Sequence, residues 1–199
     1  VTGGAGFIGS HIVDKLLPND FEVTVIDNLC TGLLENVARH QDRKAFHFVR
    51  GDIRNLNLVK KTLRDVDAVF HEAALTNVTD SVNNPLLTNE VNVTGTLNLL
   101  KASIDSDVKR FIYASSAAIY GKTTTLPHPE DLTPQPISPY GVSKLAAESY
   151  VKVFYEVYGL ETVCLRYFNV YGPRQTYGPY SGVITLFINQ FLSNQPPII

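Results

Sequence analysis

The segment Thr2-Gly3-Gly4-Ala5-Gly6-Phe7-Ile8-Gly9 places glycines at positions 3, 6 and 9, directly before an apolar segment with helical periodicity. Gly3 permits a sharp turn from strand to helix, Gly6 lets the backbone approach a pyrophosphate, and Gly9 lets the helix pack closely on a sheet. The free N–H groups and the positive dipole end of such a helix attract an anion. The spacing therefore predicts a phosphate-binding turn, and a glycine turn without a ligand is the alternative.

The rest of the chain alternates short apolar runs with longer segments of helical period. This alternation is typical of a parallel sheet covered by helices on both faces. We therefore expect an α/β protein with a doubly wound parallel sheet, the Rossmann fold. The predicted strands are residues 22–26, 45–49, 68–71, 109–114 and 162–168, and the predicted helices are residues 7–17, 56–64, 85–103, 139–158 and 183–192.

The composition is that of a globular protein. Of the 199 residues, 44% are hydrophobic and 18% are charged, and 17 Lys and Arg face 19 Asp and Glu. This balance excludes a disordered tail and gives no indication of a nucleic-acid or membrane partner. Cys30 and Cys164 fit a reducing compartment, and no secretory signal opens the chain, so we expect a cytoplasmic protein.

The two ends of the sequence interrupt expected elements. The chain contains no methionine, opens directly in the glycine turn, and stops at Pro197-Ile198-Ile199, where a strand would begin. We therefore expect a chain that is cut at both ends. Residues 1–168 would form the nucleotide-binding domain, and residues 169–199 would begin a substrate-binding region.

Polar and small residues follow the predicted strands, at the edge where open α/β sheets bind ligands. Asp27 can accept hydrogen bonds from both hydroxyls of an adenosine ribose and would repel a 2′-phosphate, which favours NAD over NADP. A turn-forming role for Asp27 is the alternative. Asp52 lies where the adenine would rest. Besides the three glycines, the expected NAD-binding residues are Phe7, Ile8, Asp27, Asn28, Asp52, Ile53, Ala73 and Ala74.

The segment Tyr140-Gly141-Val142-Ser143-Lys144 is the most informative for chemistry. Tyr140 and Lys144 are four residues apart in a predicted helix and project from one face. A free tyrosine has a pKa near 10, and ionising it at neutral pH takes roughly 4 kcal/mol, which an ammonium and a positive nicotinamide ring can supply. Ser116, at a strand end, can reach the same reacting oxygen. The alternatives are a solvated helix face and a serine bonded to backbone.

These motifs, together with Arg166-Tyr167-Phe168-Asn169 and Tyr171-Gly172-Pro173-Arg174, resemble the NAD-dependent epimerase/dehydratase family of extended short-chain dehydrogenases/reductases. The resemblance covers essentially the whole chain. It implies Ser116, Tyr140 and Lys144 as the catalytic set, with Tyr140, Lys144 and the helix asparagine Asn92 also contacting the cofactor, and Asn169 as a contact of the substrate diphosphate. The chain departs from some similar epimerases in carrying Thr76, expected on the sugar side, where they carry a lysine. Val183 and Ile184, at the start of the last predicted helix, are expected to flank the base.

The residues after Ser116 bear on which reaction is expected. Dehydratases of this family resemble one another in an Asp-Glu pair there, and the methyl groups of Ala117 and Ala118 cannot move a proton. The remaining pattern is similar to the family's 4-epimerases of UDP-glucose or of UDP-N-acetylhexosamines. This resemblance implies inversion at C4 of a UDP-sugar through a transient 4-keto intermediate, with NAD regenerated in each cycle. A dehydrogenase, a dehydratase or decarboxylase, and a non-catalytic NAD-binding protein stay open as alternatives.

The expected helix 139–158 has more apolar surface than one sheet face needs, from Val151, Phe154, Tyr155 and Tyr158. Family members resemble this chain in pairing two such helices per subunit across a dimer, so we expect a homodimer. The charged residues 39–44 are expected to be a solvated helix end, and His71 to be a packed histidine. No His, Cys or Asp spacing indicates a metal site.

Overall fold

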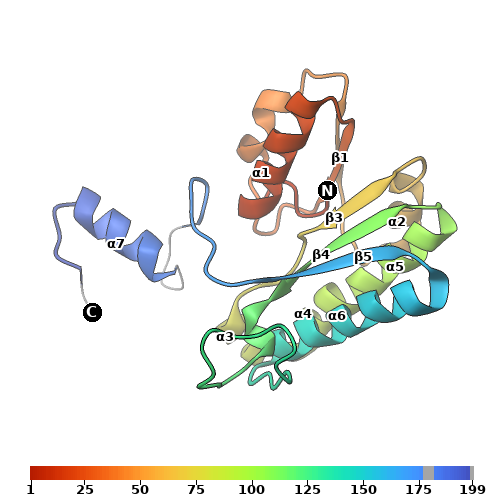
Figure 1. Cartoon of the computed structure of the whole chain (residues 1–199). Helices are drawn as coiled ribbons and strands as arrows, with labels where there is room; N and C mark the ends of the chain where they lie inside the picture. The colour runs from red at the N-terminus through yellow and green to blue at the C-terminus, as the bar shows by residue number, and fades with distance from the viewer. Residues whose placement is uncertain (177–181, 198–199) are drawn as a thin grey trace.

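The computed structural model describes residues 1–176 and 182–197 of the chain. Within these ranges, five strands pair in parallel, and helices lie on both faces of the sheet (Figure 1). The predicted doubly wound α/β fold is thereby confirmed. The strands are β1 (Val23–Asp27), β2 (Phe46–Arg50), β3 (Ala68–His71), β4 (Arg110–Ser116) and β5 (Glu161–Tyr167).

The first residues of the chain join two parts of the sheet, β1-β2 and β3-β4-β5. Thr2 forms parallel bridges to Ile26 of β1 and to His71 of β3. The backbone N–H of Thr2 donates to Phe70 O at 2.9 Å, and that of Ile26 donates to Val1 O at 3.0 Å. The glycine turn therefore begins in the middle of the sheet, between β1 and β3.

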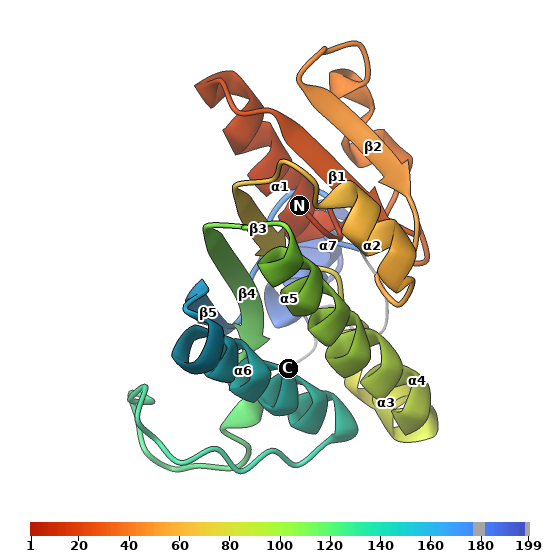
Figure 2. The same ribbon diagram turned by 90° about the vertical axis from the view of Figure 1, so that its right-hand side faces the viewer.

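The helices lie close to their predicted positions. Figure 2 shows α2, α5 and α6 on one face of the sheet and α1 on the other. The helices are α1 (Phe7–Leu16), α2 (Leu56–Thr62), α3 (Val78–Asn83), α4 (Pro85–Asn89), α5 (Gly95–Asp105), α6 (Pro139–Tyr158) and α7 (Val183–Leu192), and the 3-10 turns are Leu17–Asn19, Leu34–Asn36, Ala38–His40 and Ala117–Ile119.

The predicted helix 85–103 differs in detail from the structure. It consists of α4 and α5 with a π-helical segment, Glu90–Thr94, between them. Such a segment takes up one extra residue per turn and is frequent at functional sites. The short helix α3 was not predicted, and it begins where the Asn77 side chain accepts a hydrogen bond from Asp80 N at 3.1 Å.

Helix α6 begins and ends at residues suited to those positions. The Ser138 hydroxyl accepts a hydrogen bond from Gly141 N at 3.1 Å, and Pro139 is the first helical residue. Gly159 ends the helix with a left-handed φ of +70°. These caps fix the start of α6, and therefore Tyr140, relative to the sheet.

Two apolar cores lie on opposite faces of the sheet. The larger contains Val69, Phe111, Leu99 and Val151, all at most 4% exposed, under α5 and α6. The smaller includes Val13 and lies between α1 and the β1-β2 pair. Burying such side chains contributes roughly 1.5–3 kcal/mol each. Cys30 and Cys164 are both free thiols.

Residues beyond β5 leave the sheet, and α7 stands apart from it (Figure 1). No residue of α7 is fully buried. The boundary between residues 168 and 169 stays a prediction. Among the helices of the described ranges, none has the length and apolar character needed to cross a membrane.

Candidate active site

The glycine turn leaves no space for side chains at Gly3, Gly4 and Gly9. Gly3 has a φ of +66°, and a Cβ atom on it would lie 2.8 Å from Ala73 N. A Cβ atom on Gly9 would lie 2.2 Å from Gly3 O, so its close neighbour is the turn itself rather than a strand. Gly6 N donates to Gly3 O at 3.0 Å. The structure therefore holds the tight backbone cradle that the spacing predicts.

Asp27, at the end of β1, braces this turn. Its carboxylate accepts hydrogen bonds from Ala5 N at 3.0 Å and from Leu29 N at 2.8 Å, and the residue is 8% exposed. A carboxylate has about four acceptor sites, so lone pairs remain for a ligand. The turn-forming role is thus present in the structure, and the ribose role predicted for Asp27 remains compatible with it.

A cavity of about 160 Å³ opens beside this carboxylate, at the carboxyl ends of β1, β2 and β3. Asn28 donates to Asp52 at 3.0 Å, and Arg54 donates to Asp52 at 2.8 Å. The hydrogen bond from Arg54 lowers the pKa of Asp52 to about 2. The cavity is lined by six of the predicted cofactor residues, Asp27, Asn28, Asp52, Ile53, Ala73 and Ala74, and also by Arg54, which the sequence had not indicated.

Ser116 and Tyr140 come together at the far end of the same sheet edge. Ser116 ends β4, Tyr140 is the second residue of α6, and the Ser116 hydroxyl lies near enough to the Tyr140 phenol to lower the pKa of that phenol. The Ser116 hydroxyl also accepts a hydrogen bond from Ala118 N at 3.1 Å, so the backbone role given as its alternative is present. Tyr140 N donates to the Ser81 hydroxyl at 3.1 Å, which ties α6 to α3. The two side chains thus lie at one edge of the sheet, and their shared contact with a reacting oxygen stays a prediction.

Lys144 lies one turn further along α6 and is almost fully buried. Its ammonium donates to Ala114 O at 2.9 Å and lies 5.1 Å from the centroid of the Tyr113 ring. Burial lowers the pKa of Lys144 to about 8. Burial raises the pKa of Tyr140, and the Ser116 hydrogen bond offsets only part of this effect. The Lys144 ammonium is directed at the Ala114 carbonyl, and the ionisation of Tyr140 expected from this ammonium together with a nicotinamide ring stays a prediction.

Asn92 occupies the π-helical segment and is 1% exposed. Its amide nitrogen donates to Leu75 O at 2.9 Å and to the Ser143 hydroxyl at 3.0 Å, and its oxygen accepts from Leu75 N at 2.8 Å. Ser143 in turn donates to Tyr140 O at 2.7 Å. Both amide donors are used within the protein, so Asn92 supports the start of α6, and the cofactor contact expected for it stays a prediction.

The model of the NAD dependent epimerase/dehydratase family matches residues 1–199. The chain belongs to this family. It is 44% identical to the UDP-glucose 4-epimerase of Lactobacillus helveticus over 174 residues, which is 86% of this chain and 51% of that protein.

Two solved structures of this family are similar over nearly the whole chain. The UDP-N-acetylglucosamine 4-epimerase of Methanobrevibacter ruminantium, in complex with UDP-N-acetylmuramic acid, has a TM-score of 0.94 and 43% identity, and covers 100% of this chain and 63% of its own. The UDP-glucose 4-epimerase of Thermus thermophilus, in complex with NAD, has a TM-score of 0.88 and 44% identity, and covers 98% of this chain and 62% of its own. The chain spans about half to two thirds of the length of its curated relatives.

The sequence did not predict a buried ion pair of this epimerase/dehydratase-family domain, formed by Glu148 and Arg166. Glu148 is 1% exposed and accepts hydrogen bonds from the Ser115 hydroxyl at 2.6 Å and from Arg166 at 2.8 Å. Burial favours the neutral acid, but the hydrogen bonds from Arg166 and Lys152 outweigh it and lower the pKa of Glu148 to about 2. The sequence feature that could have indicated a role for Glu148 is its position four residues after Lys144, on the same helical face.

Arg166 extends this network to the long loop before α6. Its guanidinium donates to the Tyr120 hydroxyl at 2.8 Å and to Glu130 O at 2.6 Å, and stacks 4.9 Å from the centroid of the Tyr120 ring. The loop, α6 and β5 are thereby joined near Ser116. The segment Arg166-Tyr167-Phe168-Asn169 indicated the family, but it did not predict this role of Arg166.

His71 is a packed histidine, as expected. Its ring nitrogens contact the hydroxyls of Thr2 and Thr96, each at 2.8 Å, and burial lowers its pKa to about 3. The ring is therefore neutral at physiological pH. Across residues 1–176 and 182–197, no group of three or more His, Cys, Asp or Glu side chains is placed to hold a metal ion.

The predicted substrate residues lie outside the dinucleotide cavity. Thr76 and Asn169 are exposed, on the loop after β3 and just beyond β5. Val183 is 55% exposed and opens α7, and Ile184 follows it half-buried. Their contacts with a substrate stay predictions.

Proposed function

We propose that this protein is an NAD-dependent epimerase that inverts C4 of a UDP-hexose. The observation that carries the proposal is the group at the end of β4, where Ser116 lies beside the half-buried Tyr140 and the buried Lys144 lies one helical turn away. Ala117 and Ala118 follow Ser116, so the group lacks the acid pair that water elimination would use.

The residues at the other end of the sheet edge fit NAD. The cradle formed by Gly3 and Gly9 has no room for a Cβ atom, which suits a backbone that approaches a pyrophosphate. The adjoining cavity presents the Asp27 and Asp52 carboxylates to a ribose and an adenine. When bound, NAD accepts a hydride from the sugar carbon and later returns it.

The catalytic group moves the proton that accompanies this chemistry. Tyr140, as the phenolate, takes the proton of the sugar 4-hydroxyl, and as the phenol it returns this proton after the 4-keto sugar has turned its other face to the site. Ser116 bridges the phenol and the substrate oxygen. Lys144 keeps a positive charge below pH of about 8, which stabilises negative charge that develops on the phenol.

Product analysis tests this proposal. The protein, expressed from its complete reading frame, is incubated separately with UDP-glucose and UDP-N-acetylglucosamine, and the nucleotide sugars are separated by chromatography. A C4 epimer without lasting absorbance at 340 nm supports an epimerase. Net accumulation of NADH would instead indicate a dehydrogenase, loss of water or carbon dioxide a dehydratase or decarboxylase, and bound NAD without turnover a non-catalytic binding protein.

The second substrate is a specific alternative. The solved structure with the TM-score of 0.94 is that of a UDP-N-acetylglucosamine 4-epimerase, whereas the Thermus structure is that of a UDP-glucose 4-epimerase. The ratio of kcat/KM for the two sugars decides between them. A ratio near one would mean that the pocket admits the N-acetyl group without selecting for it.

A homodimer and a cytoplasmic location belong to the same proposal. Of the residues expected to widen α6, Val151 and Phe154 pack into the core instead, and Tyr155 and Tyr158 are exposed. A second set of exposed apolar residues supports pairing: Val142, Tyr150, Val153 and Val157 share one side of α6, and Val78, Val82 and Leu86 lie on the neighbouring α3 and α4. Sedimentation should give a dimer, and Val153→Glu should give a monomer; a wild-type monomer would contradict the dimer.

A further inference from the structure

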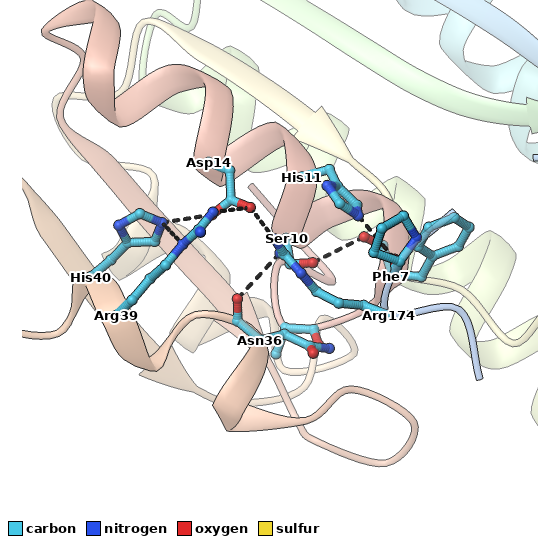
Figure 3. A network of polar contacts seen from close by, with 10 residues as sticks. Phe7, Ser10, His11, Asp14, Asn36, Arg39, His40 and Arg174 are labelled. Carbon is cyan, nitrogen blue, oxygen red and sulfur yellow. Dashed lines mark hydrogen bonds and ion pairs between the residues drawn. The ribbon is translucent and has the colours of Figure 1, made fainter. Parts of the chain in front are cut away.

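The chain after β5 returns to the helix that follows the glycine turn. Gly172 lies against Phe7, the first residue of α1, because a Cβ atom on it would be 3.5 Å from the Phe7 ring. The His11 ring nitrogen lies 3.0 Å from Pro173 O, one turn further along α1 (Figure 3). Residues 172–174 therefore lie along the start of the helix whose N-terminus is the proposed phosphate site.

A charged contact fastens this segment. The Arg174 guanidinium pairs with the Asp14 carboxylate of α1 (Figure 3). It also donates to Asn36 O at 3.3 Å, and the Asn36 side chain donates to Ala5 O at 2.8 Å. Arg174 is thus connected both to the third turn of α1 and, through Asn36, to the glycine turn itself.

Asp14 is held as a permanent anion by its surroundings. Arg39 and His40 contact the same carboxylate from the β1-β2 connection, with the His40 ring nitrogen at 2.7 Å. Burial favours the neutral acid, but the hydrogen bonds from Arg39, His40 and Arg174 outweigh it and keep the pKa of Asp14 well below its usual range. The expectation of a solvated helix end is wrong for His40, which is 4% exposed.

The two arginines on Asp14 differ in what they join. The Arg39 side chain is 60% exposed and links α1 only to the turn Ala38–His40. The Arg174 side chain is 21% exposed and links α1 to a segment 160 residues away. Exposed ion pairs contribute little to stability, and partly buried ones contribute more. The structure therefore offers a matched pair of variants that remove the same charge from the same carboxylate.

We propose that Asp14 and Arg174 form a clasp that holds residues 172–174 against the start of α1 and thereby slows release of the dinucleotide. The inference rests on the NAD site proposed above. Residues 172–174 lie against Phe7 and His11 at the start of α1, where the pyrophosphate of a dinucleotide would be held, so loss of the clasp would loosen this end of the site. An enzyme that regenerates its NAD in every cycle has no need to exchange it, and a slow release keeps the site loaded.

The test measures dissociation of the dinucleotide, with NADH as the probe. Protein preloaded with NADH is mixed with excess NAD in a stopped-flow instrument, and the loss of bound-NADH fluorescence gives koff. We expect Arg174→Gln to raise koff by about 10-fold or more, because most effects of lost contacts appear in the dissociation rate. Arg39→Gln should change it less than about 2-fold, and Asp14→Asn should resemble Arg174→Gln.

Further measurements separate a clasp from a general loss of stability. Thermal unfolding without dinucleotide reports stability, and hydrogen exchange of a peptide covering residues 172–176 reports whether the segment is released. Should Arg174→Gln fold poorly, Arg174→Lys serves as the second variant, since it keeps the charge and loses the reach to Asn36. The Asp14→Asn/Arg174→Gln double variant should release NADH no faster than the faster single variant.

The outcomes are distinct. An unchanged koff in Arg174→Gln or in Asp14→Asn overturns the clasp, and so does an equal acceleration in Arg39→Gln, which would assign the effect to the charge of Asp14 alone. Failure of the wild-type protein to retain NADH contradicts the proposed NAD site itself. In that case slow exchange at residues 172–176 would leave a purely structural tie, and the role in release would be rejected.

Discussion

The glycine turn and the site formed by Ser116, Tyr140 and Lys144 lie at the same edge of one sheet, but backbone atoms shape the first and side chains shape the second. At the turn, the critical positions are glycines, and the geometry is set by backbone atoms such as Gly3 O and Ala73 N. At the other end, the critical positions are buried ionisable side chains whose pKa values are shifted by burial and by their partners. Substitutions at the first end should therefore act through shape and ligand affinity, and those at the second through protonation.

The largest effect is expected for Tyr140→Phe, which removes the proton-transferring oxygen and nothing else. Turnover with the UDP-hexose should fall by about 1000-fold or more, since general acid–base groups contribute roughly 10²–10⁴-fold. The affinity for NAD should stay within about 2-fold, because Tyr140 lies outside the cavity at the dinucleotide end. Steady-state kinetics and NAD titration measure the two effects.

Tyr150→Phe is the matched control for this substitution. Tyr150 lies on the same helix but is 42% exposed, so removing its hydroxyl should leave kcat unchanged. If Tyr140→Phe kept its turnover, the phenol would have no part in the reaction. Substitutions at this end would then not act through protonation, as the comparison with the glycine turn requires.

A smaller effect is expected at the glycine turn, where Gly3 can be compared with Gly159, a glycine of similar φ at the end of α6. Gly3 and Gly159 have φ values of +66° and +70°, and a Cβ atom at Gly159 would have nothing within 4 Å. Gly159→Ala should therefore cost only the strain of the left-handed conformation, roughly 1–2 kcal/mol of unfolding free energy, with NAD affinity unchanged.

Gly3→Ala carries the same strain and also brings its Cβ atom to 2.8 Å from Ala73 N. The turn must shift, so NAD affinity should fall by about 100-fold while the folded state survives with reduced stability. Calorimetric NAD titration and urea unfolding of both variants measure this. Equal NAD affinities in Gly3→Ala and Gly159→Ala would show that the close approach to Ala73 has no part in binding.

What could be predicted from the sequence follows the same division. The glycine spacing is local, and a turn of this kind needs only neighbouring residues to define it. The meeting of Ser116 and Tyr140 could also be predicted, because strand ends and helix starts share one edge of a parallel sheet. Both are consequences of secondary structure alone.

Contacts set by packing between distant segments were not predictable in this way. Arg166 reaches Glu148, and Arg174 reaches Asp14 across 160 residues, and no local spacing encodes either pair. The direction of the Lys144 ammonium was also missed, because helical spacing gives the face of a residue but not the carbonyl at which its side chain ends. The ionisation of Tyr140 depends on whether this ammonium faces the phenol or the Ala114 carbonyl.

The smallest effect concerns the stability of the protein and comes from the burial of Lys144. Its ammonium donates to Ala114 O, lies over the Tyr113 ring and is attracted by Glu72, but burial is the larger effect and lowers its pKa to about 8. Between pH of about 8 and about 10.4, the unfolded chain binds a proton that the folded protein does not, so stability should rise with pH across this window. Below pH 8 the full cost of burying the charge is present.

Lys144→Met should therefore stabilise the protein at pH 7 by roughly 1–3 kcal/mol, since replacing a poorly paired buried charge by an apolar side chain is often stabilising. Lys152→Met is the control: that side chain is 59% exposed and pairs with Glu148 at 2.7 Å, so its loss should be neutral or destabilising. Urea unfolding of the wild type and both variants at pH 7 and pH 9.5, without added dinucleotide, measures this. The advantage of Lys144→Met should shrink at the higher pH, because the wild-type lysine is then mostly neutral. A Lys144→Met variant less stable than the wild type at both pH values would mean that the contact with Ala114 outweighs the burial of charge, and that the catalytic end is stabilised by the groups that serve its chemistry.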